Sequence, residues 1–197
     1  MTKEIRTGEV IRKTKETDIS ISVALDGKGT AEIDTGIGFF DHMLTAFAVH
    51  GGFGLSLTVR GDLQVDGHHT VEDTGIVLGR AFALALGDRS GIERYGTFFV
   101  PMDEALGFAS VDVGGRAFLA FDAAFPEERC GDYDTCLTEE FFRALSFNAG
   151  MTLHLHAMAG KNSHHIAEAL YKAAGHALKI ACQANGQGVL STKGVLD

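Results

Sequence analysis

The chain has 197 residues, of which 45% are hydrophobic, and a formal net charge of −9. This length and apolar content suit a compact domain with a shared core and argue against a disordered chain. The acidic balance argues against nucleic acid as a partner, because duplex binding needs a cationic surface.

Neither export nor membrane insertion is expected. The N-terminus is charged and lacks an apolar segment of the signal-peptide type, and no hydrophobic run approaches the roughly 20 residues of a membrane span. Three cysteines, Cys130, Cys136 and Cys182, have no C-x-x-C spacing, so they predict neither a disulfide framework nor a zinc knuckle. We therefore expect a cytoplasmic protein with no membrane partner.

The first half of the chain predicts a hairpin, a helix, further strands and a second helix. Period-two alternation around an Asp-Gly turn is typical of a hairpin, and apolar residues at helical spacing indicate an amphipathic helix. The predicted elements are strands at 19–25 and 30–34 paired about Asp26-Gly27, a helix at 39–50, strands at 55–59 and 63–65, and a helix at 68–86.

The second half predicts the same order. Its elements are a strand at 98–101, a hairpin of 108–113 and 116–121 about Gly114-Gly115, a helix at 138–149, a strand at 153–157 and a helix at 164–184. Strands with helices covering one face imply a layered α+β architecture. We therefore expect one compact domain made by duplication, with halves at 1–95 and 96–197, the second carrying a C-terminal substrate-binding tail.

A His-His-x-x-Glu motif occurs twice, at residues 68–72 and 164–168. The copies lie 96 residues apart (164 minus 68), and upstream His42 falls opposite Glu140 at an offset of 98 (140 minus 42). Such drift in the offset is what two diverged copies of one unit would show.

Each copy brings imidazole and carboxylate groups together, because residues three and four apart share a helix face. These ligands suit Mn, Fe(II), Co or Zn, and no thiolate shifts the choice toward soft metals. The doubled pattern predicts two metals with four ligands each, and leaves open which histidine binds which metal and which ion is carried. The candidate ligands are His42, His68, His69, Glu72, Glu140, His164, His165 and Glu168.

The remaining histidines have plainer interpretations. His154 and His156 share one face of a predicted strand, where packing or hydrogen bonding is expected. His176 takes the repeat position of Arg80 and is expected to be a solvated helix residue.

Four ordered segments carry a family resemblance: residues 36–44 (Gly-Ile-Gly-Phe-Phe-Asp-His-Met-Leu), 68–73 (His-His-Thr-Val-Glu-Asp), 160–169 (Gly-Lys-Asn-Ser-His-His-Ile-Ala-Glu-Ala) and 191–196 (Ser-Thr-Lys-Gly-Val-Leu). Together they resemble the imidazoleglycerol-phosphate dehydratase family of histidine biosynthesis, over essentially the whole chain. The resemblance implies a duplicated fold like the second domain of ribosomal protein S5, two Mn²⁺ per active site, and sites at subunit contacts in a homo-oligomer of 24 subunits. The chain departs from many members at Glu140, where they have histidine, and its length leaves no room for the phosphatase fused to this enzyme in some bacteria.

The resemblance also implies a reaction, the dehydration of D-erythro-imidazole-glycerol phosphate to imidazole-acetol phosphate. Two cations on the ring nitrogens would favour the imidazolate, because metals lower the pKa of bound ligands. The ring could then expel the hydroxyl through a diazafulvene-like intermediate, and the resemblance assigns the proton transfers to Glu16.

The resemblance assigns the substrate's phosphate to Arg94, Arg116, Ser191 and Lys193, since Arg grips phosphate oxygens bidentately and Lys adds a point charge. It also places His50, Lys172 and the metal ligands other than Glu140 near the substrate. Without the family, the basic residues would be ordinary solvated charges, and His50 a helix C-terminal histidine favoured by the macrodipole.

Two other functions fit the metal pattern alone. A di-metal hydrolase would use the same ligands to activate water and would release phosphate. A metal-storage protein would take up metal without turning over any substrate.

Overall fold

The computed structural model describes residues 5–196. Its elements are β1 (Thr7–Lys13), β2 (Thr17–Ala24), β3 (Ala31–Asp34), α1 (Gly38–Gly51), β4 (Gly54–Gly61), α2 (His68–Leu86), β5 (Tyr95–Met102), β6 (Ala105–Asp112), β7 (Phe118–Asp122), β8 (Arg129–Cys130), β9 (Tyr133–Asp134), α3 (Leu137–Ala149), β10 (Thr152–Ala159) and α4 (Ser163–Cys182). Within residues 5–196, none of the helices combines the length and apolarity needed to cross a bilayer.

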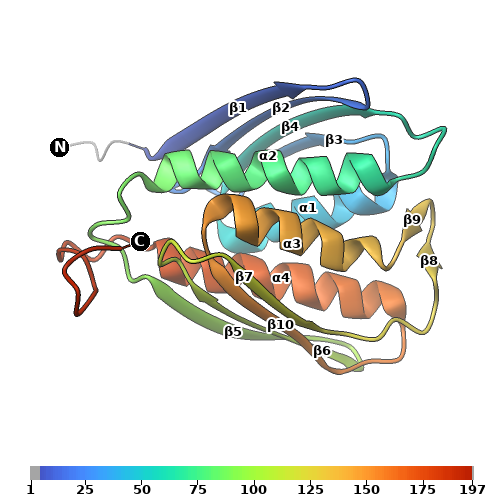
Figure 1. The fold of residues 1–197 in the computed structure, drawn as a ribbon. Helices are drawn as coiled ribbons and strands as arrows, with labels where there is room; N and C mark the ends of the chain where they lie inside the picture. Colours follow the sequence, from blue (N-terminus) through green and yellow to red (C-terminus); the bar gives the residue numbers. More distant parts are fainter. Residues whose placement is uncertain (1–4, 197) are drawn as a thin grey trace.

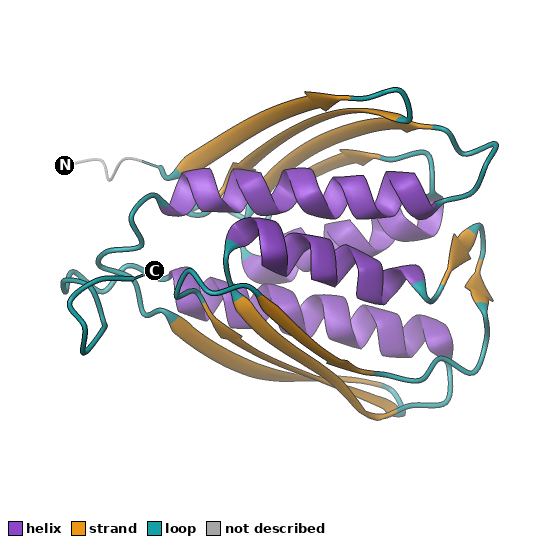
Figure 2. Ribbon diagram, viewed as in Figure 1, coloured by secondary structure: helices purple, strands orange, loops and turns teal. Residues whose placement is uncertain are grey.

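The helices form a middle layer between two four-stranded sheets (Figures 1 and 2). α2 packs on β1 and β2, and α4 packs on β5 and β6. Buried and more exposed residues alternate along β2 and β6, as expected for strands with one face on the core. The α+β fold class is thus confirmed. The division at residue 95 stays a prediction, and β5 begins at Tyr95.

The two predicted hairpins are wrong, for one reason that applies to both halves. The sheet orders are β1-β2-β4-β3 and β5-β6-β10-β7, so β2 does not pair with β3, nor β6 with β7. A turn signal marks where a strand ends but not which strand becomes its neighbour. β3 leads into α1, and the crossover returns β4 parallel to β3 and between β3 and β2.

Within residues 5–196, the hairpins that do form are β1–β2, β5–β6 and the short β8–β9. β1 gave no sequence signal, because its inward positions are Gly8, Val10 and Arg12 instead of an apolar series. Residues 63–65, predicted as a strand, instead form a turn in which Val65 N–H donates to Asp62.

The helices pair across the duplication. α1 of the first half packs against α4 of the second, and α2 packs against α3. Each pair closes at a glycine: an added Cβ would lie 2.5 Å from the Phe47 carbonyl oxygen at Gly175 and 2.6 Å from that of Leu145 at Gly79. These glycines match at the repeat offset of 96 (175 minus 79), so the duplication preserved the close approach of both pairs.

All four helices run in the same direction and begin at the same end of the layer, beside β8 and β9 (Figure 1). Their positive dipole ends gather there, where carboxylates are favoured. Their C-terminal ends gather at the opposite end, together with the start of β1 and the segment that follows α4.

Candidate metal centre

The predicted metal ligands lie in the first two turns of the four helices. His42 is on α1 and Glu140 on α3, while the two His-His doublets open α2 and α4. Folding therefore gathers residues up to 126 positions apart (168 minus 42) at one end of the helix layer.

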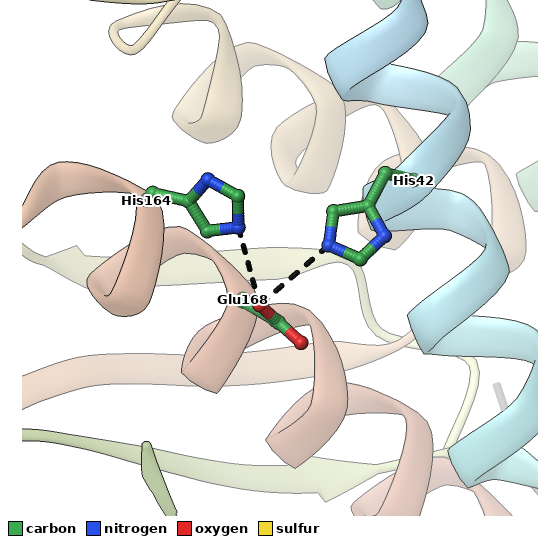
Figure 3. Close-up of side chains that lie close together, drawn as sticks. All are labelled: His42, His164 and Glu168. Atoms are coloured by element: carbon green, nitrogen blue, oxygen red, sulfur yellow. Dashed lines mark ion pairs between the residues drawn. The ribbon is translucent and has the colours of Figure 1, made fainter. Parts of the chain in front are cut away.

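Three of these ligands, His42, His164 and Glu168, converge in one group (Figure 3). The Nε2 atoms of His42 and His164 lie 3.6 and 3.3 Å from the same oxygen of Glu168. The three donor atoms lie within 4.8 Å of one another. Because α1 packs on α4, the group combines one ligand of the first half with two of the second. Two nitrogens and one oxygen, with no sulfur, suit a borderline divalent cation.

Glu168 is held in its charged form. Its side chain is 9% exposed, and burial alone would raise the pKa of the carboxyl group, but the hydrogen bond from Lys172 Nζ (2.7 Å) and the two nearby imidazoles outweigh burial and lower that pKa. Lys172, predicted to contact substrate, is itself largely buried and lies 3.7 Å from Met102 Sδ. One carboxylate oxygen therefore faces the imidazoles while the other is fixed by an ammonium.

Neighbouring side chains fix the start of α4. Asn162 caps the helix by accepting from the backbone N–H of His164 (2.9 Å) and His165 (3.2 Å). Phe39 packs edge-on against the His164 ring at 5.0 Å, and its ring is tilted against that of Tyr133 at 5.4 Å. Beside these side chains opens a cavity of about 550 Å³.

The first motif copy does not form an equivalent group within one chain. His68 Nε2 lies 3.5 Å from Glu72, and both side chains are 45% exposed. Glu140 lies 3.5 Å from the Arg143 guanidinium. Among residues 5–196, the group that includes Glu168 is the one place where three metal-type donors meet. A single chain thus assembles part of one of the two expected ligand sets, and the ligand assignments stay predictions.

The second histidine of each doublet turns to a carboxylate outside the motif. His69 Nδ1 donates to Asp62 (3.0 Å) and His165 Nδ1 to Glu104 (2.8 Å). These hydrogen bonds raise the pKa of both imidazoles and, at the second site, lower the pKa of Glu104 to about 2. A neutral imidazole held this way keeps Nε2 as an acceptor, the usual state of a metal-binding histidine. Neither carboxylate was predicted; the one available signal was that Glu104 takes the repeat position of Glu16 (104 minus 16 is 88).

Glu16 is exposed in the turn between β1 and β2, where its backbone N–H donates to Thr14 Oγ1 at 3.1 Å. Its charge adds to the effect of Asp62 in raising the pKa of His69. The predicted acid/base therefore lies at the same end of the molecule as the ligands.

The predicted phosphate ligands lie at the other end. Arg94, Arg116, Ser191 and Lys193 line one cavity of about 630 Å³. Arg94 N–H donates to the Ala181 carbonyl near the end of α4. His164 begins the same helix, and the 17 intervening steps (181 minus 164) span about 25 Å at 1.5 Å per residue. One chain does not bring the phosphate cavity and the ligand group together.

Three further histidines pack against aromatic rings. His176 is a correction, because it is half-buried, stacked on Phe98 at 4.2 Å and hydrogen-bonded to His50 at 3.1 Å instead of solvated. Burial lowers the pKa of both imidazoles. His154 and His156 contact phenylalanine rings on the outer face of the second sheet, as expected.

Comparisons with known proteins agree with one another. The model of the imidazoleglycerol-phosphate dehydratase family matches residues 35–178. The dehydratase of that name from Streptococcus gordonii is 57% identical over 98% of this chain and 100% of its own length, and that of Acetivibrio thermocellus is 55% identical over 97% and 99%. The solved dehydratase of Staphylococcus aureus superposes with a TM-score of 0.82 at 40% identity, covering 90% of this chain and 99% of its own. The solved dehydratase of Pyrococcus furiosus, in complex with (S)-C348, superposes with a TM-score of 0.83 at 37% identity, covering 95% of this chain and 100% of its own.

Proposed function

Because the chain belongs to the imidazoleglycerol-phosphate dehydratase family, we propose that it removes water from D-erythro-imidazole-glycerol phosphate to form imidazole-acetol phosphate in histidine biosynthesis. The observation that carries the proposal for this chain is the convergence of His42, His164 and Glu168. These three residues supply ligands for a cation that would bind the substrate's heterocycle. The three cysteines are free, in keeping with work in the cytoplasm.

We propose two Mn²⁺ per active site, held by the eight predicted ligands. The assembled group fits such an ion because its donors are imidazole and carboxylate, and because Glu168 stays charged next to Lys172. Bound to the substrate's ring nitrogens, the cations would lower the pKa of the ring and stabilise negative charge on it.

Glu16 would move the protons. Its carboxylate would take the proton from the carbon that becomes the ketone, while the hydroxyl on the carbon next to the ring leaves as water with a second proton. The resulting enol becomes the ketone when a proton is added to the carbon next to the ring and the enol hydroxyl loses its proton. Exposure of Glu16 near His69 is compatible with this role.

The separation of the two functional ends supports a site shared between copies. The substrate's glycerol chain is far too short to connect the His164 group with the Arg116 cavity about 25 Å along the layer. We therefore propose that one copy holds the imidazole ring and another holds the phosphate, within the homo-oligomer of 24 subunits. The half-exposed His69 and His165 would complete the metal sites across such contacts.

The test is to incubate the purified protein with imidazole-glycerol phosphate and assay ketone and inorganic phosphate together. Ketone formation that stops on chelation and returns with Mn²⁺ is expected. Release of phosphate would instead indicate a hydrolase, and metal uptake without turnover a storage protein. His42→Ala should lose turnover, whereas the matched His154→Ala, on the outer face of a sheet, should keep it.

A further inference from the structure

A second basic cavity lies at the end of the molecule opposite the group of His42, His164 and Glu168. It has a volume of about 640 Å³, and Arg6, Lys28 and Lys179 line it together with Asp26. None of the predicted site residues borders it. Three cations gathered on a chain of net charge −9 form a local surplus of positive charge.

This cavity is the repeat counterpart of the one lined by Arg94 and Arg116. Arg6 matches Arg94 and Lys28 matches Arg116 at one offset of 88 (94 minus 6; 116 minus 28). The backbone agrees as well. Leu25 N–H donates to the Arg6 carbonyl at 2.9 Å. Its counterpart 88 residues later, Val113 N–H, donates to the Arg94 carbonyl at 3.0 Å.

Each of the two arginines is also paired with an aspartate. Arg6 donates through Nε and Nη2 to the two oxygens of Asp26, at 2.8 Å each. Arg94 makes a similar pair with Asp112, at 2.7 and 3.0 Å. Asp112 lies two positions before the repeat counterpart of Asp26, which is Gly114 (26 plus 88). Each arginine is thus held by a carboxylate, which lines the cavity in the case of Asp26 but not in the case of Asp112. In both cavities an exposed cation lies on the following loop.

The third cation differs between the cavities. Lys193 of the C-terminal tail supplies it in one, and Lys179 of the last turn of α4 supplies it in the other. The helix dipole alone would explain Lys179 at a C-terminus. It does not explain Lys28 on a loop, nor why an arginine held by an aspartate occurs at matching repeat positions in both cavities.

We propose that the cavity of Arg6, Lys28 and Lys179 is a second phosphate-binding site, for a small phosphorylated molecule. Guanidinium and ammonium groups match phosphate oxygens, and the volume is within the range of small-ligand sites. The inference rests on the proposed function for the phosphate chemistry of the Arg116 cavity.

The test counts bound inorganic phosphate per chain by equilibrium dialysis of the metal-loaded protein at constant ionic strength. Lys28→Ala/Lys179→Ala should bind one phosphate fewer than the unmodified protein, or bind it at least tenfold more weakly, with turnover of imidazole-glycerol phosphate unchanged. Both lysines are exposed, so circular dichroism should show an intact fold. An unchanged count and affinity would overturn the second site.

Arg116→Ala/Lys193→Ala provides the matched comparison. It should lose a different phosphate and also weaken substrate binding. If this variant kept every bound phosphate, the assignment of the substrate's phosphate to the Arg116 cavity would be wrong. The result with Lys28→Ala/Lys179→Ala would still decide whether the second site exists.

Discussion

The α1–α4 pair and the α2–α3 pair share one backbone design but carry different side chains. Both close at a glycine that touches a carbonyl of the partner helix. One turn beyond the motif Glu, however, α4 has Lys172 where α2 has Ile76 (172 minus 96). The α1–α4 pair also has a contact between His50 and His176, where the α2–α3 pair has one between Asn148 and Arg80.

This difference explains why one pair gathers ligands and the other does not. Lys172 holds one oxygen of Glu168, so the other stays directed at the two imidazoles. Glu72 has no such support from Ile76 and is half-exposed. Duplication preserved the scaffold, while the residues that organise a cation site diverged.

The largest expected effect comes from removing the charge of the organised carboxylate. Glu168→Gln should reduce Mn²⁺-dependent turnover at least about 100-fold, beyond the loss seen when only a ligand's supporting contact is removed. It should also destabilise the metal-free protein by about 1–3 kcal/mol, because Lys172 is left buried without its carboxylate.

Glu72→Gln is the matched control. It should also impair turnover as a predicted ligand, yet change the free energy of unfolding of the metal-free protein by about 0.5 kcal/mol or less, as exposed sites do. Urea unfolding of both variants measures the contrast. Equal destabilisation would mean that the two pairs are organised alike.

Substitution of the paired glycines tests the shared part of the design. Gly175→Ala and Gly79→Ala should each cost about 1–3 kcal/mol in urea unfolding, because a methyl group would press on a carbonyl oxygen and separate the helices. Only Gly175→Ala should also weaken cation binding by the His42 group, since it moves α1 against α4. Equal loss of Mn²⁺ affinity in both would show that the pairs are coupled.

The pair of Glu104 and His165 predicts a pH window of stability. The pKa of Glu104 is lowered from 4.5 to about 2, so its stabilisation is present above pH 4.5 and lost as the pH falls toward 2. The pKa of His165 is raised from 6.5, so its stabilisation is present below pH 6.5 and lost as the pH rises through the higher folded value.

Glu104→Gln should therefore destabilise the metal-free protein most between about pH 4.5 and 6.5, as measured by thermal unfolding across pH. Asp62→Asn, which removes the counterpart at His69, is the comparison. A loss that did not vary with pH would indicate that Glu104 acts by packing or backbone contacts alone.

The smallest expected effect is at Glu140. It lies beside Arg143, a cation that a metal would have to displace, so Glu140→Ala should reduce Mn²⁺ affinity by less than about tenfold and stability by about 0.5 kcal/mol or less. Glu140→His should bind Mn²⁺ at least as well as the alanine variant. A loss of Mn²⁺ affinity in Glu140→Ala as large as that in Glu168→Gln would mean that Glu140 contributes as much to metal binding as Glu168 does.

The sequence predicted the helices well because each carries its own signal. The predicted range 68–86 coincides with α2, and the residues that recur at helical spacing within it are buried: Val71, Gly75, Leu78, Phe82 and Ala85. Strand pairing was not predictable in the same way, since the position of β4 between β2 and β3 depends on a crossover and not on local spacing.

The residues of the candidate site were likewise predictable only where the sequence carries a local or periodic signal. The motifs identified His164 and Glu168 and the repeat identified His42, because those signals are local or periodic. Asp62 and Glu104 were missed because each meets its histidine only after folding, from a loop with no pattern of its own.

The common direction of the four helices has one more consequence. The chain is polar from end to end, because the group of His42, His164 and Glu168 lies at the positive ends of the helix dipoles, and Arg94 and Arg116 line a cavity near the negative ends. In the proposed shared site, a substrate that bridged unlike ends would join copies head to tail, which is a heterologous contact. Such contacts propagate until a rotation closes them, so the chemistry of a single small molecule would favour closed rings or shells over isolated dimers.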